Sequence, residues 1–242
     1  MSNKIIFTAV DEYADKVSLK PYPAHQSVPK WWKDMPPFNI DRDNPTGKRL
    51  VVKDNANNGS PKKCTPMLDA ITAGYIIPLW TDIQIRSISD TEYVPGIFWK
   101  ARRDVFFPNT DASRMIEGPH GYYSATFKYI NQWMIKTPKG YSVSMHQPAG
   151  YEQSPLKAIP SVLDTDKFNS HIPISFWVKN EYEGVVEKGT PLVQVVPFKR
   201  DSWIAEYDSM TAEEFHHNQE RSIGTTLLNG YIKNFWSKKS YN

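Results

Sequence analysis

Two aspartates separated by one residue are the clearest candidates for chemistry in this sequence. Asp164 and Asp166 flank Thr165, directly after the short run Ser161 to Leu163. A carboxylate held beside a substrate can act as a general base that takes a proton from an attacking water. Aspartates in a turn also accept hydrogen bonds from nearby backbone N–H groups, and then they serve the fold. The sequence leaves both interpretations open.

A histidine close to these aspartates adds a third titratable group. His171 follows Asp166 in the same polar stretch. Imidazole nitrogens and carboxylate oxygens together form the ligand sets of many zinc and iron sites. A metal site at this turn is therefore a further hypothesis, and chance clustering of polar residues in a loop is its alternative.

A second titratable group lies near the C-terminus, where the spacing is helical. Glu213 and His217 are four residues apart, as are His216 and Glu220, so each pair can share a helix face. Two histidines with carboxylates can hold zinc or iron. The sequence lacks the His-Glu-x-x-His motif of metalloproteases and the His-x-Asp pattern of iron oxygenases. A solvated helix face is the alternative interpretation.

Other common catalytic motifs are missing. No nucleophile elbow, phosphate-binding Walker loop or dinucleotide-binding glycine motif occurs in the chain. The single cysteine, Cys64, has no accompanying pattern of histidine and asparagine, and it fits a small buried residue better than a nucleophile. No complete catalytic set is present, which favours a protein that is not an enzyme.

The elements that must position the aspartates are predicted to be strands. Apolar and polar residues alternate from Ile172 to Val178, and further apolar runs follow at 185–186 and 192–196. Alternation with a period of two, bounded by Gly, Pro and Asp, is typical of strands with one buried face. We expect a β-hairpin core here and a mainly β fold: an antiparallel, jelly-roll-like sandwich or barrel.

Both ends of the chain differ from this core. Residues 18–40 contain five prolines, which predicts an extended strap with one helical turn near Pro29 to Met35. Large apolar residues recur at helical spacing near the C-terminus, and Thr211 to Glu214 are spaced as a capping box, which predicts a terminal amphipathic helix of about 25 residues with a break near Gly224. The strap and the helix are the expected contact elements for other subunits. The predicted interface residues are Trp31, Trp32, Leu228, Tyr231, Phe235 and Trp236.

Length and composition are those of one folded domain. The 242 residues are 40% hydrophobic and 23% charged, which fits a folded protein with a real core. We expect a single domain over 1–242, with a strap and loops at 1–63, a β core at 64–203 and a C-terminal helical segment at 204–242. One cysteine excludes an internal disulfide and suggests a reducing compartment.

Charge and hydropathy limit the partners that we expect. The net charge is only +3 and the basic residues are scattered, so nucleic-acid binding is not expected. The N-terminus lacks the apolar run of a signal peptide, and no stretch is long enough to span a membrane. These features predict a soluble protein that is not secreted by a signal peptide.

The order of features from 137 to 199 resembles the trimeric dUTPase family. Val162 to Asp166 stands where that family has its aspartate motif, and Lys188 to Val196 stands where it has its glycine-to-glutamine strand. The resemblance implies a jelly-roll fold and, as one alternative, a divergent nucleotide hydrolase. In it Asp164 would act as the base, Asp166 and Gln194 would orient the substrate, and Mg²⁺ would be the cofactor.

A second resemblance covers more of the chain. The runs 29–37 and 63–69, together with Thr-Pro-Lys-Gly at 137–140 and Lys-Gly-Thr-Pro at 188–191, resemble an uncharacterised family of tailed phages and bacteria. This resemblance implies a phage-encoded protein and no particular chemistry.

These observations lead to three functional hypotheses. The first is a structural or interaction protein without a cofactor, namely an accessory component of a tailed-phage head, neck or tail. Its partners would be copies of itself in a homo-oligomer or other particle proteins, in the virion or the host cytoplasm. The second is the nucleotide hydrolase that uses Asp164, and the third is a metal-dependent oxygenase on the same fold.

Overall fold

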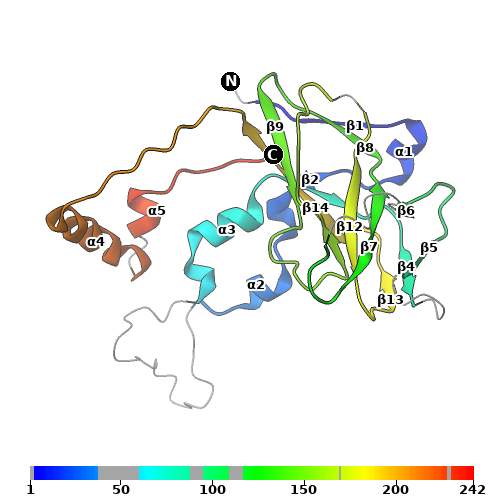
Figure 1. The fold of residues 1–242 in the computed structure, drawn as a ribbon, viewed down its shortest axis with the longest axis horizontal. Helices are drawn as coiled ribbons and strands as arrows, with labels where there is room; N and C mark the ends of the chain where they lie inside the picture. The colour runs from blue at the N-terminus through cyan, green and yellow to red at the C-terminus, as the bar shows by residue number, and fades with distance from the viewer. Residues whose placement is uncertain (1–2, 38–59, 88–94, 109–116, 169, 228–229) are drawn as a thin grey trace, which may run out of the picture. The chain divides into compact units, whose positions relative to one another are not determined.

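The chain divides into two compact units. The computed structural model describes residues 3–37, 60–87, 95–108, 117–168, 170–227 and 230–242 (Figure 1). Unit 1 comprises Met1–Ser27 and Gly74–Arg200, and unit 2 comprises Val28–Ala73 and Asp201–Asn242. The prediction of one domain over 1–242 stays a prediction.

Unit 1 is built from antiparallel sheets. The four-stranded sheet has the order β10 (Leu156–Ala158), β12 (Pro173–Lys179), β7 (Tyr122–Ile130) and β6 (Phe106–Pro108). The five-stranded sheet has the order β11 (Ser161–Leu163), β9 (Tyr141–His146), β14 (Pro191–Lys199), β3 (Tyr75–Pro78) and β2 (Tyr22–Pro23).

Two smaller sheets and two short helices complete unit 1. One sheet joins β13 (Gly184–Val186), β4 (Ile83–Arg86) and β5 (Gly96–Trp99), and the other pairs β1 (Ile6–Ala9) with β8 (Trp133–Lys136). Helix α1 (Glu12–Val17) follows β1, and the 3₁₀ turn η1 (Ala24–Ser27) follows β2. The Asp11 carboxylate caps α1 by accepting the Ala14 N–H at 2.8 Å.

The hydrophobic core lies between the two large sheets. Ile174, Phe176 and Val178 of β12 are buried, as are Val193 and Val195 of β14, and all five belong to one contiguous cluster. The alternation that predicts a strand at 172–178 is therefore confirmed, because the apolar positions face the core. The predicted mainly β, antiparallel sandwich is also confirmed (Figure 1). The sheets of the described residues stay open, so the alternative of a closed barrel does not form.

One expectation about strand pairing is wrong. The three strands from Pro173 to Lys199 do not form a hairpin core, because each pairs in a different sheet: β12 with β7 and β10, β13 with β4, and β14 with β9 and β3. Local alternation predicts a strand and its buried face, but it contains no information about which distant strand provides the hydrogen bonds.

Unit 2 contains the remaining helices of the described residues. In the proline-rich segment, α2 (Lys30–Asp34) begins after Pro29, which confirms the predicted helical turn at 29–35. The 3₁₀ turn η2 (Pro61–Lys63) and α3 (Thr65–Thr72) follow, and α4 (Ala212–Leu227) and α5 (Gly230–Asn234) lie near the C-terminus.

Polar contacts connect these pieces of unit 2. The Lys62 ammonium donates to the Lys33 carbonyl at 2.7 Å, which joins η2 to α2. The Asp69 carboxylate of α3 accepts the Trp236 indole N–H at 2.9 Å and the Lys239 ammonium at 2.6 Å. The end of the chain is thus fastened to α3 through Asp69.

The C-terminal segment contains the predicted helix, which begins at the predicted capping box. Residues 201–211 are extended, and the helix begins only at Ala212. A reciprocal capping box fixes this start, because Glu214 N–H donates to the Thr211 hydroxyl at 3.2 Å and the Glu214 carboxylate accepts the Thr211 N–H at 2.8 Å. Within the described ranges, no helix has the length and apolar character that a membrane crossing requires.

Candidate functional site

The turn that carries the two aspartates is tightly folded. It follows β11, and the Asp164 carbonyl accepts the backbone N–H groups of Lys167 at 3.0 Å and Phe168 at 2.9 Å. The Thr165 side chain between the aspartates is fully buried. Its hydroxyl lies 2.7 Å from the hydroxyl of Thr137. Thr165 therefore fixes the turn to the segment that follows β8.

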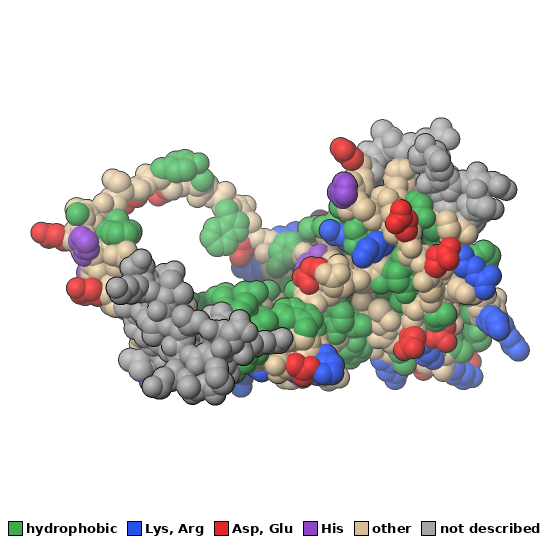
Figure 2. All heavy atoms as spheres, turned by 90° about the horizontal axis from the view of Figure 1, so that it is seen from below, with side chains coloured by type: hydrophobic (Ala, Val, Ile, Leu, Met, Phe, Trp, Pro, Cys, Tyr) green, Lys and Arg blue, Asp and Glu red, His purple; other side chains and the backbone are tan. Residues whose placement is uncertain are grey.

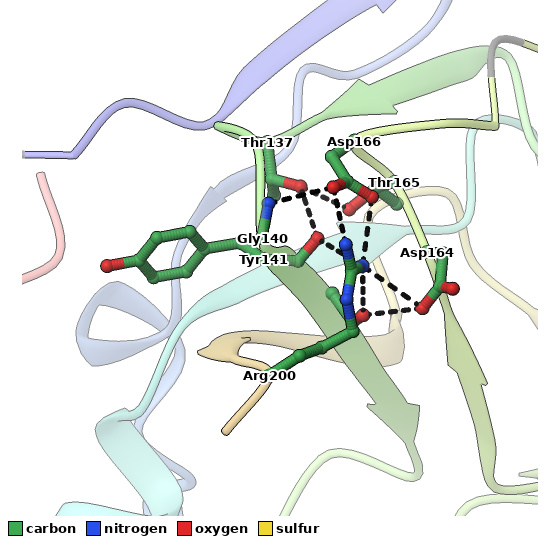
Figure 3. Close-up of polar contacts among 8 residues, drawn as sticks. Thr137, Gly140, Tyr141, Asp164, Thr165, Asp166 and Arg200 are labelled. Carbon is green, nitrogen blue, oxygen red and sulfur yellow. Dashed lines mark hydrogen bonds and ion pairs between the residues drawn. The ribbon is translucent and has the colours of Figure 1, made fainter. Parts of the chain in front are cut away.

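Asp166 is held by an arginine at the end of β14 (Figure 3). The two terminal nitrogens of Arg200 donate to the two carboxylate oxygens of Asp166, one of them at 2.9 Å. The Gly140 N–H donates to the same carboxylate at 2.8 Å. Only 4% of the Asp166 side chain is exposed. These donors, first the guanidinium and then the backbone N–H, hold the pKa of Asp166 well below its usual range.

Gly140 is suited to this contact by its backbone conformation. Its φ is +86°, in the left-handed region that glycine adopts without strain. This turn between β8 and β9 directs the Gly140 N–H at Asp166, and the Gly140 carbonyl accepts the Arg200 N–H at 2.9 Å. Gly140 thus contacts both members of the ion pair.

Asp164 occupies a more open position. The Ser142 hydroxyl donates to its carboxylate at 2.6 Å, and an Arg200 nitrogen lies 3.2 Å away. The hydrogen bond from Ser142 contributes most to lowering the pKa of Asp164, and the charge of Arg200 adds to the effect. Half of the side chain, 51%, is exposed to solvent.

This geometry suits a structural clamp better than a general base. A base works best with a pKa near the working pH, and both carboxylates are shifted in the opposite direction. Asp166 is nearly buried, and three N–H donors occupy its two oxygens. Asp166 therefore fits the structural interpretation, in which the carboxylates of the turn accept backbone N–H groups. We call Asp164, Asp166, Ser142, Gly140 and Arg200 the aspartate clamp.

The structure does not bring Gln194 to the clamp. Gln194 lies on β14 six residues before Arg200, and at about 3.3 Å per residue this separates them by about 20 Å. Its side chain is fully buried, and its amide oxygen accepts the Ala149 N–H at 2.9 Å. Gln194 therefore supports the loop after β9 and does not orient a ligand at Asp164.

His171 is also placed apart from the aspartates. It lines a hollow of about 430 Å³ together with Arg102, Arg103 and Gln132, and neither aspartate lines that hollow. In the parts of the chain that the structure describes, no three His, Cys, Asp or Glu side chains gather as a metal site would require. The pairs Glu213 with His217 and His216 with Glu220 belong to the exposed first turns of α4.

The predicted interface residues have different environments. Trp31 is 45% exposed and Phe235 is 48% exposed, so both can contact a partner. Trp32 does not fit this role, because only 3% of it is exposed and its indole is used for packing within the chain. Tyr231 is half-buried, and the Trp236 indole is hydrogen-bonded to Asp69. Leu228 lies outside the described residues.

Two groups of candidate functional residues were not predicted from the sequence. Arg200, the cation of the clamp, is distant from Asp166 along the chain, and only its position after a strand could have suggested it. The second group is the exposed stretch after Arg200, where Trp203 and Ile204 are each 89% exposed and Tyr207 is 96% exposed. The signal for this stretch is present in the sequence, since three large apolar residues stand there among acids.

The sequence matches no protein-family model, and no curated protein matches it. The resemblances to the dUTPase family and to the phage family therefore stay predictions.

Proposed function

We propose that this protein is a structural or interaction protein that assembles with other protein subunits, as an accessory component of a tailed-phage particle. The observation that carries the proposal is the exposure of Trp203, Ile204 and Tyr207, which are 89%, 89% and 96% exposed on an extended segment. Large apolar side chains gathered in water are typical of surfaces that a partner covers. Aromatic residues are also the commonest anchors in protein interfaces.

The segment that carries these residues is defined here as the arm, residues 201–220. It begins directly after Arg200, runs extended to Thr211 and continues into the first turns of α4. Met210 is 58% exposed and Phe215 is 50% exposed, so apolar side chains continue along its length. Figure 2 shows hydrophobic and acidic side chains along this segment.

The aspartate clamp supports the same proposal. The partly buried pair of Asp166 and Arg200 fixes the last residue before the arm to the turns after β8 and β11. An interaction segment binds with less entropic loss when its point of attachment is rigid. The role in a phage particle is supported by the sequence resemblance of the runs 29–37 and 63–69 to the phage family.

The proposal is tested by the composition of purified particles. We expect mass spectrometry to find the protein in virions purified from infected cells. A variant with Trp203→Ser, Ile204→Ser and Tyr207→Ser should be lost from particles. Val162→Ser is the matched control, because Val162 is an apolar side chain that is 64% exposed elsewhere on the surface. A protein that stays in the lysate as a soluble monomer would contradict the proposal.

A further inference from the structure

The acidic and the basic residues of unit 2 are concentrated in different segments of the chain. The arm contains six acidic residues and no lysine or arginine; the acids are Asp201, Glu206, Asp208, Glu213, Glu214 and Glu220. Such a charge imbalance within 20 residues contrasts with the chain as a whole, whose net charge is +3. An acidic, apolar segment is best accommodated by a surface that is basic and apolar.

The other described segments of unit 2 are both basic and apolar. We define the lysine platform as α2, η2, α3 and residues 230–242, which Lys62 and Asp69 connect through hydrogen bonds. Its described residues 28–37, 60–73 and 230–242 contain two acids, Asp34 and Asp69, and seven lysines. The lysines are Lys30, Lys33, Lys62, Lys63, Lys233, Lys238 and Lys239.

The lysine platform also exposes apolar side chains. Five of them are between about one third and one half exposed: Trp31 at 45%, Met67 at 43%, Leu68 at 36%, Ile232 at 44% and Phe235 at 48%. The arm exposes five comparable groups of its own, Trp203, Ile204, Tyr207, Met210 and Phe215. Arm and platform are thus complementary both in charge and in apolar content.

We infer that the arm of one copy of this chain docks on the lysine platform of a second copy. This inference rests on the proposed function, since it names the partner of the same arm. Within one chain the side chains of Trp203, Ile204 and Tyr207 remain 89%, 89% and 96% exposed, so they are available to a second copy. Docking brings the arm carboxylates to the platform ammonium groups and covers the exposed rings. Reciprocal docking closes a dimer, whereas head-to-tail docking builds a ring or a filament.

The test compares molar masses measured by light scattering during size-exclusion chromatography of the full-length protein. The wild type is expected to exceed the monomer mass of 27.9 kDa at low salt and to approach it at high salt. The arm variant Glu206→Lys, Asp208→Lys, Glu213→Lys and the platform variant Lys33→Glu, Lys233→Glu, Lys238→Glu should each be monomeric. All six side chains are exposed, so both variants should keep the circular dichroism and melting temperature of the wild type.

Mixing the two variants gives the decisive result. Each variant repels itself, but the reversed arm of the first matches the reversed platform of the second, so an equimolar mixture should associate again. A mixture that stays monomeric, or a wild type that is monomeric at low salt, overturns the inference. A monomeric wild type whose arm is nevertheless needed for recovery in virions would leave the proposed function standing, with a different protein as the partner.

Discussion

The guanidinium of Arg200 and the carboxylate of Asp166 form a two-point ion pair, although the two residues are 34 positions apart in the chain. The pair connects the end of β14 to the turn after β11, and the Gly140 N–H completes the set of donors. Since the side chain of Asp166 is only 4% exposed, water cannot easily replace these donors if the pair is broken.

The first prediction concerns the pH dependence of stability. The folded-state pKa of Asp166 lies below the unfolded value of about 3.9, so its stabilising contribution is present above about pH 4. This contribution is lost as the pH falls from about 4 through the depressed pKa. Asp166→Asn should therefore lower the free energy of unfolding at pH 7 and make it less dependent on pH between about 4 and 2. Urea denaturation at a series of pH values measures both effects.

Asp164→Asn is the matched control for this prediction. The Asp164 carboxylate is half exposed, and its pKa is lowered chiefly by one side-chain hydrogen bond. We expect a smaller loss of stability than for Asp166→Asn. An equal or larger loss would contradict the assignment of Asp166 as the central anion of the clamp.

The second prediction concerns Gly74, which lies where β3 begins. Its φ is +69°, and a Cβ atom there would lie 2.0 Å from the carbonyl oxygen of Val195, so backbone would have to move. Gly121 has a similar φ of +84°, but a Cβ atom there would meet no atom within 4 Å. Gly74→Ala should cost clearly more than Gly121→Ala, for which conformational strain of about 1 kcal/mol is expected. Chemical denaturation of both variants compares the costs, and similar losses would contradict this account.

The third prediction separates a structural from a ligand-binding role of Gln194. Gln194→Met keeps the side-chain size and leaves the Ala149 N–H without its present acceptor, which should cost about 1–3 kcal/mol. Since the residue is fully buried, the loss should appear in thermal unfolding of the protein alone. Unchanged stability would mean that Gln194 is not needed for the fold.

Local periodicity predicted the strands well but not their partners. The alternation from Ile172 to Val178 correctly identified Ile174, Phe176 and Val178 as core positions, because a strand places every second side chain on one face. The pairing of β14 with β3 and β9 depends on contacts with distant segments, which no local pattern records.

At the site, too, the local pattern predicted the turn but not the distant residue that pairs with it. Two aspartates around a small hydroxyl residue predicted a turn, and a turn is found. The conclusion that Asp166 is a clamp needed Arg200, whose position depends on the register between β14 and β9. The resemblance to the dUTPase family grouped Gln194 with the aspartates, and the rise of about 3.3 Å per residue along β14 separates them.

The arm was not predicted from the sequence for another reason. Patterns of alternation or helical spacing describe residues that are buried by their own chain, whereas Trp203 and Tyr207 are almost fully exposed. Within the C-terminal segment at 204–242, the helix start predicted from the capping box Thr211 to Glu214 is confirmed. The capping box of Thr211 with Glu214 starts the helix at the next residue, Ala212.

The fourth prediction addresses the nucleotide hydrolase. Since the pKa of Asp164 is lowered and Gln194 is distant, we expect no stabilisation of the protein by dUTP or the other common dNTPs with Mg²⁺. A ligand present at 100 times its dissociation constant would raise the free energy of unfolding by about 2.7 kcal/mol, which thermal denaturation detects readily. A raised melting temperature that disappears in Asp164→Asn would favour the hydrolase instead.

The fifth prediction distinguishes side chains that stabilise the fold from side chains that are available to a partner. Trp203→Ser and Tyr207→Ser remove side chains that are 89% and 96% exposed, so at concentrations where the protein is monomeric each should change the free energy of unfolding by less than about 0.5 kcal/mol. Phe176→Ala, a substitution of an equally apolar but fully buried ring, should cost about 3–5 kcal/mol. Denaturation at high dilution measures all three. A large loss for the arm variants would show that the arm packs within its own chain, and the arm would then not be available to a partner.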